Sequence, residues 1–361
     1  METKDISMPD APFLLNAGDL PDINFKHIIG LTDLTGIIQH AVFATPNRKE
    51  GYCIDDNSRA LLLTVWAYKN NHYQLAAELL PVYLSFIHYM QARDGYFKNF
   101  LTYDKVKPEV RGSEDSFGRT IMALGYLIND GVSPLQVKTA QEIFARAYPH
   151  VGSLTSLRGM ANSIVGICQF IKYHFPDDVK RNMVIHLAEK MIREYKENKN
   201  NNWHWFEPIL TYDNAMLPLA LLNAYEVTQH EEYLAIAFES IEFLESKVFS
   251  NNFIRPVGNQ GWCPKDSPPA QFDQQPIDVM AMILCYQQAF RLTRSPEYIH
   301  RMYTSYRWFL GNNDLGQSLY DPSTGGCADG LHSTGINLNQ GAESTLAYWI
   351  SHLTVTSVLS E

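Results

Sequence analysis

Two kinds of hydrophobic pattern alternate along the chain, and they predict two kinds of helix. In the first kind, apolar residues recur at helical spacing on one face and charged residues occupy the other. Such a helix buries one face only, so these segments are expected on the outside of the molecule. They are His72–Arg93, Pro134–Ala147, Asp178–Glu197, Glu231–Lys247 and Pro296–Phe309, with Lys26–Phe43 as a weaker first member.

Helices of the second kind are apolar on nearly all sides, which predicts that they are buried on most sides. Their residues are 57–68, 116–127, 158–171, 214–225, 276–290 and 341–353. The two kinds alternate strictly, six of each. A recurring pair of this length indicates a repeated helical hairpin, so we predict an all-α protein with six inner and six outer helices.

Ionisable residues of the inner segments are almost confined to their first turns. The first charged residues, 43 to 65 positions apart, are Asp56, Asp115, Arg158, Asp213, Asp278 and Glu343. If the inner helices run parallel in a closed ring, these residues meet at one end of it, which we call the mouth. Most links from outer to inner helices are long, so the long loops also lie at the mouth, where functional residues are expected.

Composition excludes several classes of protein. Of the 361 residues, 45% are hydrophobic and 19% are charged, which indicates a large core rather than disorder. The net charge of −10, without a Lys/Arg cluster, argues against a nucleic-acid partner. No segment reaches the ~18 uncharged apolar residues of a membrane span, and no secretory signal is visible. We expect no membrane association and a cytoplasmic protein; its oligomeric state is left open.

Residues 1–24 are expected to form an irregular lead-in because three prolines exclude a long helix there. Residues 25–361 are expected to form a single domain. The five cysteines lack CxxC spacing and are interpreted as buried thiols. No HxxxH, HExxH or GxGxxG pattern is present, so we predict neither a metal site nor a cofactor.

Twelve alternating helices with long loops at the inner N-termini resemble the six-hairpin, (α/α)6 toroid of many glycoside hydrolases, over about Lys26–Leu359. Within that group, Tyr52-Cys53-Ile54-Asp55-Asp56-Asn57 is similar to the aromatic and paired-aspartate motif of bacterial α-mannanases and unsaturated glucuronyl hydrolases. The resemblance implies carbohydrate chemistry by carboxylates, with Asp55 and Asp56 as the first candidates.

Hydrolysis of a glycosidic bond needs one carboxyl group as acid and a second as base or nucleophile. The candidates for these two roles are Asp55, Asp56, Glu114, Asp115, Glu207 and Asp213. Glu207 is the preferred acid because Trp203, Trp205 and Phe206 suggest apolar surroundings, which keep a carboxyl group protonated. Capping of helix N-termini is an alternative reason for acids at these positions, although one acid suffices for a cap.

Substrate contacts are expected from other residues of the mouth and its loops. Aromatic rings can stack on sugar faces or plug the loops, and Arg59 and Arg119 can form internal salt bridges or bind an anion. At the start of the third inner helix, Arg158 and its neighbours occupy the place that acids have in the other inner helices. That side of the mouth can bind substrate rather than react with it. The set is Tyr52, Arg59, Arg119, Arg158, Trp203, His204, Trp205, Tyr212, Trp262, Asp273, Gln275, Asp278, His332, Gln340 and Glu343.

These observations predict a glycoside hydrolase that acts on an oligosaccharide. A phosphorylase, a lyase or a sugar epimerase on the same scaffold is the first alternative. A lyase or epimerase would rest on Tyr/His chemistry, and phosphorolysis on an anion site such as Arg59 with Arg119. A carbohydrate-binding protein without catalysis is the second alternative, and it would keep the aromatic rings without a working pair of carboxylates.

Overall fold

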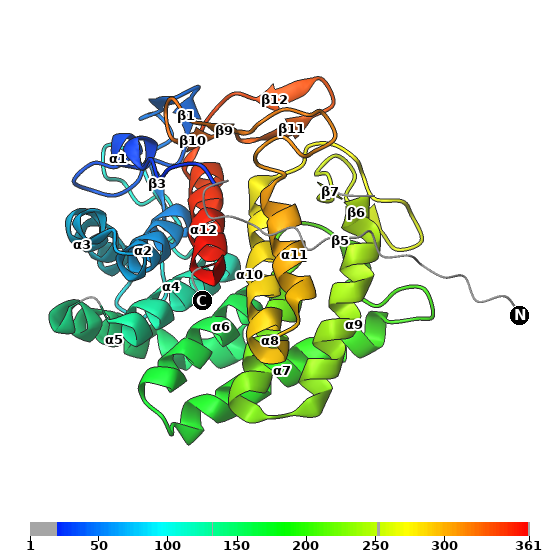
Figure 1. Cartoon of the computed structure of the whole chain (residues 1–361). Helices are drawn as coiled ribbons and strands as arrows, with labels where there is room; N and C mark the ends of the chain where they lie inside the picture. The colour runs from blue at the N-terminus through cyan, green and yellow to red at the C-terminus, as the bar shows by residue number, and fades with distance from the viewer. Residues whose placement is uncertain (1–19, 132, 251–252, 360–361) are drawn as a thin grey trace, which may run out of the picture.

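The computed structural model describes residues 20–131, 133–250 and 253–359. Most of the expected lead-in, residues 1–19, lies outside this range. Six buried helices form the centre of the molecule (Figure 1): α2 (Ile54–Lys69), α4 (Glu114–Asp130), α6 (Leu157–Tyr173), α8 (Met216–Thr228), α10 (Pro276–Thr293) and α12 (Ala342–Leu359). Each contacts the next, and α12 contacts α2, so the ring is closed. The predicted (α/α)6 toroid is confirmed.

Six further helices surround this ring: α1 (Lys26–Leu31), α3 (Tyr73–Met90), α5 (Pro134–Ala147), α7 (Asp178–Asn198), α9 (Glu231–Val248) and α11 (Pro296–Tyr306). Links from an inner helix to its outer partner are short, and such links reverse the chain direction. The inner helices therefore run parallel, with their N-termini at one end of the ring.

The first outer helix is much shorter than the sequence pattern predicts. It ends at Leu31 because a turn follows, in which Asp33 Oδ1 accepts the N–H of Thr35 at 2.7 Å. Residues up to Pro46 then form a hairpin of β1 (Ala41–Val42) and β2 (Thr45–Pro46). The short helix α1 still contacts α12 and takes the sixth position in the outer layer.

Short two-stranded sheets occupy the loops that lead into the inner helices, several of them at the top of Figure 1. Two of these sheets join successive loops, because β3 (Tyr52–Cys53) pairs with β4 (Phe100–Leu101), and β5 (Ile209–Leu210) pairs with β8 (Cys263–Pro264). The others are hairpins within one loop: β6 (Phe249–Ser250) with β7 (Phe253–Ile254), β9 (Tyr320–Asp321) with β10 (Gly326–Cys327), and β11 (Gly330–His332) with β12 (Gly335–Asn337). The loops at the mouth are thus tied to one another.

Helices α4 and α6 approach so closely that their backbones touch. A Cβ atom on Gly118 would lie 2.3 Å from the Gly159 carbonyl oxygen, and one on Gly125 would lie 2.1 Å from that of Gly166. These four glycines recur at a spacing of seven residues on both helices, so the contact runs along two turns. This contact fixes the relative height of Arg119 and Arg158 at the mouth.

No helix within the described ranges is long and apolar enough to cross a membrane. All five cysteines are free and buried, as expected.

Candidate active site

Charged side chains from the N-terminal ends of the inner helices meet at the mouth. Arg119 of α4 donates from Nη1 to Asp55 of α2 at 2.6 Å and from Nη2 to Asp213 at 3.0 Å. Arg59 of α2 donates to Asp56 at 3.2 Å and pairs with Glu343 of α12 at 3.0 Å. Residues far apart in the sequence therefore form one network that links four of the six inner helix heads.

Arg158 organises the part of the mouth beside α6. Its Nη1 donates to Glu207 at 3.0 Å, its Nη2 to the Thr211 hydroxyl at 2.7 Å, and its Nε to the Tyr212 carbonyl at 2.6 Å. The guanidinium also lies over the Tyr212 ring, 4.6 Å from its centre. The sequence suggested apolar surroundings for Glu207, but the structure pairs it with a cation.

Asp213 lies in the turn before α8 rather than in the helix. Its φ of +51° is a left-handed conformation that is uncommon for a residue with a Cβ atom. The Asp213 N–H donates to Asp278 Oδ1 of α10 at 2.7 Å, which holds this turn in place. Asp278 is buried, and its Oδ1 is engaged by the backbone of a second acid, which gives it a structural role.

Adjacent aspartates on α2 experience opposite electrostatic effects. Burial alone would raise the pKa of Asp55, but the charges of Arg119 and Arg59 outweigh it, and the pKa is lowered. For Asp56 burial dominates over Arg59, and the nearby Glu343 adds to it, so the pKa rises to about 6. The Cys53 thiol also donates to Asp56 at 3.0 Å. Near neutrality Asp55 is ionised, while Asp56 carries its proton part of the time.

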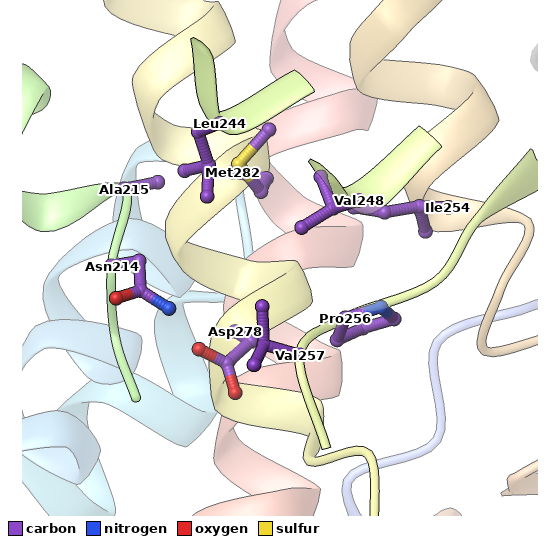
Figure 2. A pocket seen from close by; sticks show the side chains of 9 residues that line it. All are labelled: Asn214, Ala215, Leu244, Val248, Ile254, Pro256, Val257, Asp278 and Met282. Carbon is purple, nitrogen blue, oxygen red and sulfur yellow. The ribbon is translucent and has the colours of Figure 1, made fainter. Parts of the chain in front are cut away.

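Burial also raises the pKa of two other acids. The pKa of Asp213 is raised because burial outweighs the charge of Arg119. The pKa of Asp278 is raised well above its usual value by burial and by the charge of Asp213. Figure 2 shows the apolar residues beside Asp278, which include Leu244 and Val248 of α9, around a cavity of about 10 Å³.

A second small cavity lies beneath the charged network, inside the ring. It measures about 20 Å³ and is lined by all six inner helices, with Arg59, Arg119 and Asp213 above and methionines such as Met122 and Met280 below. This volume accommodates about one water molecule. The cavity inside the ring is therefore too small for a ligand the size of a sugar ring.

Two of the predicted catalytic acids, Glu114 and Asp115, form hydrogen bonds with neighbouring elements. Glu114 accepts the N–H groups of Thr155 at 2.7 Å and Ser156 at 2.6 Å, which stabilises the start of α6. Asp115 accepts the hydroxyl groups of Ser156 and Tyr212. Both acids therefore have hydrogen-bond partners in the next helical hairpin. Capping of α4 does not account for these partners.

The predicted aromatic contacts divide into buried and accessible side chains. Trp203 and Trp205 are buried, with Trp203 against Phe243 of α9 and its Nε1 donating to the Glu207 carbonyl at 2.7 Å. Tyr52 is also buried, and its hydroxyl donates to Asp33 at 2.6 Å. Tyr212 is 37% exposed, and its ring lies 6.2 Å from that of the partly buried Trp262, which leaves these two rings at the mouth.

The remaining predicted contacts lie in the outer loops. His204 pairs with Glu239 of the outer helix α9 at 2.6 Å, so it faces away from the mouth. Gln340 binds Asp321 at 3.1 Å within its own loop. His332 Nδ1 contacts the Asp273 carboxylate, and Gln275 donates to the Asp273 carbonyl at 3.4 Å. The His332–Asp273 pair joins the loops that precede α10 and α12. In the described part of the chain, no group of three or more His, Cys, Asp and Glu residues could hold a metal ion.

Neither a protein-family model nor a curated protein matches this chain. Solved structures do. A sugar epimerase from a ruminal bacterium has a TM-score of 0.70 at 9% identity, over 91% of this chain and 94% of that one. Cellobiose 2-epimerase from Bacillus thermoamylovorans has a TM-score of 0.68 at 9% identity, over 94% and 96%. A GH76 α-mannanase from Bacteroides thetaiotaomicron has a TM-score of 0.62 at 12% identity, over 86% and 88%.

The chain has the six-hairpin (α/α)6 fold. Identities this low establish a shared fold only. Within the six-hairpin fold of this chain, the mouth is the end where the inner helix N-termini and the long loops meet. The chemistry must be argued from the residues found there.

Proposed function

We propose that this protein is a glycoside hydrolase that cleaves an oligosaccharide at the mouth of the ring. The observation that carries the proposal is the pair of adjacent aspartates at the N-terminal end of α2, each held by an arginine of the charged network. Their pKa values are shifted in opposite directions, which supports the proposal. Two carboxyl groups with separated pKa values can divide the roles of acid and base at one pH.

In this proposal Asp55 is the ionised base or nucleophile, and Asp56 donates a proton to the leaving oxygen. The Asp55 side chain is 25% exposed, so it can reach a sugar above the network. Asp56 is largely buried beside it, and catalytic contacts commonly tighten only when substrate binds. Arg119 and Arg59 keep the two carboxylates in position, and Tyr212 with Trp262 offers ring faces to a sugar.

The named neighbours support this substrate class. One is an α-mannanase and two are epimerases of sugars, so this scaffold is used by carbohydrate-processing enzymes. Phosphorolysis is less well supported, because Arg59, Arg119 and Arg158 each already pair with a carboxylate. An incoming phosphate would have to compete with those carboxylates.

The test is a screen for newly released reducing ends across manno- and gluco-oligosaccharides. Asp55→Asn and Asp56→Asn are expected to lower kcat at least ~100-fold, the usual scale for losing an acid or base. Glu207→Gln should retain turnover, since its carboxylate is engaged by Arg158. Asp178→Asn, on the outer helix α7, is the matched control for a charge change. Full turnover in both Asp55→Asn and Asp56→Asn would refute the assignment.

A sugar 2-epimerase is the second candidate, favoured by the contact of His332 Nδ1 with the Asp273 carboxylate. Epimerisation requires a base that removes the proton from C2 and an acid that returns one to the opposite face. A carboxylate partner can orient the imidazole for this proton transfer. Incubation of mannose, glucose and cellobiose in D2O, followed by NMR, would reveal deuterium at C2. Deuterium incorporation that His332→Asn abolishes would favour epimerisation over hydrolysis.

A further inference from the structure

Phe43 combines an exposed aromatic ring with an unusual backbone conformation. It lies at the tip of the β1–β2 hairpin, where Val42 pairs with Thr45. Its φ is +52°, in the left-handed region that favours glycine, and the residue is 61% exposed. The two-residue loop of the hairpin requires a positive φ at its first residue, where glycine is the usual choice. The exposure of the Phe43 ring does not follow from this turn or from core packing.

The hairpin tip is fastened to the loop that enters α12. The Phe43 N–H donates to Asn339 Oδ1 at 2.9 Å, and the Phe43 carbonyl accepts the N–H of Gln340 at 2.9 Å. Lower in the hairpin, the Gln39 carbonyl accepts the N–H of Ala342, the first residue of α12, at 3.0 Å. Three hydrogen bonds thus hold the strained backbone at one position.

This position is the rim of the mouth. Ala342 directly precedes Glu343, whose carboxylate pairs with Arg59 of the charged network at 3.0 Å. Leu338, one residue before Asn339, is itself 57% exposed. An exposed aromatic ring and an exposed aliphatic side chain therefore lie on the segments that lead into the helix carrying Glu343.

We propose that Phe43 is a stacking platform for a sugar unit of an oligosaccharide, outside the unit that reacts. This inference rests on the proposed carbohydrate-processing function and specifies how the substrate extends from the site. Sugar rings present flat C–H faces to aromatic rings, and Glu343 at the start of α12, whose side chain is 46% exposed, can accept sugar hydroxyl groups. The sequence pattern gave no indication of this role, because it placed Phe43 at the end of an amphipathic helix.

Phe43→Gly separates a binding role from a structural one. Glycine adopts the left-handed conformation without strain, so this variant is expected to unfold at the same temperature as the wild type or a higher one. Loss of the ring should raise KM, or Kd by calorimetry, for mannotriose or cellotriose by about 3- to 10-fold and leave the monosaccharides unaffected. Phe43→Trp should retain affinity, and Leu135→Ala, another exposed apolar residue on outer helix α5, should change nothing.

The outcomes separate the two proposals. A wild type that neither binds nor converts either trisaccharide would contradict the proposed function itself. A wild type that binds one of them, with a Phe43→Gly variant of equal affinity, would overturn the platform alone. If Phe43→Gly has unchanged sugar affinity but a changed oligomeric state, the exposed Phe43 ring serves a protein–protein contact instead.

Discussion

The Arg119 guanidinium donates a hydrogen bond of 2.6 Å to the Asp55 carboxylate, although the two residues are 64 positions apart and belong to different helices. The same guanidinium binds Asp213, so one cation compensates two acids that are largely shielded from water. This arrangement explains why Asp55 stays ionised despite its burial. It also makes the mouth sensitive to the loss of a single arginine.

Arg119→Met should therefore affect both activity and stability. Removing the cation raises the pKa of Asp55, so the acidic limb of the pH–rate profile should move to higher pH. Leaving two carboxylates without their partner should lower the free energy of unfolding by about 3–5 kcal/mol. Lys69→Met is the matched control, because its pair with Asp130 at 2.9 Å has an exposed lysine and should contribute no more than about 1 kcal/mol. An acidic limb that stays at the wild-type pH would contradict the role of Arg119.

Asp56 should make folding stability depend on pH. Because its pKa is raised to about 6 in the folded protein, its contribution is full below the unfolded value of 3.8 and is lost as the pH rises to about 6. Asp56→Asn removes this titration. The variant should therefore gain stability relative to the wild type between those pH values, by at most about 3 kcal/mol, and the gain should then stay constant. Urea unfolding of both proteins from pH 3 to 8 measures this gain. A difference in the free energy of unfolding that is the same at every pH would contradict the raised pKa of Asp56.

Asp278 is expected to act as the hydrogen-bond acceptor that positions Asp213. Asp278→Asn keeps an acceptor oxygen at this position, so stability should fall by less than about 1 kcal/mol. Asp278→Leu leaves the buried Asp213 N–H without its partner and should cost about 1–3 kcal/mol. Chemical denaturation of the two variants compares these values. Equal losses in both would mean that the hydrogen bond is not what the carboxyl group provides.

The backbone contact between α4 and α6 should tolerate no added methyl group. Gly125→Ala places a Cβ atom 2.1 Å from the Gly166 carbonyl oxygen, so the helices must separate. We expect a loss of about 1–3 kcal/mol, together with weaker activity because Arg119 shifts. Gly30→Ala, where nothing lies within 4 Å of the added Cβ, is the control and should be neutral or slightly stabilising. Thermal unfolding of both variants measures these stability changes. Equal unfolding temperatures for Gly125→Ala and Gly30→Ala would contradict the close backbone contact.

Hydrophobic patterning was sufficient to predict the ring and the location of the mouth. A segment that is apolar on all sides must be buried, and a charge in its first turn must then lie at an end of the helix. Asp56, Asp213 and Glu343 therefore had to lie at the same end once the short links made the inner helices parallel. These conclusions depend only on local periodicity and on the length of the links, and both can be read from the sequence.

Tertiary structure decided which of those residues remain accessible. Trp203 and Trp205 lie in a polar loop by sequence, yet they turn into the core, where Trp203 meets Phe243 of α9. Glu114 binds the start of α6, and Phe43 leaves its expected helix to reach the rim. A loop side chain can be buried or exposed at similar local cost, so its position depends on a partner that lies far away in the sequence. Only the packed chain brings that partner within contact distance.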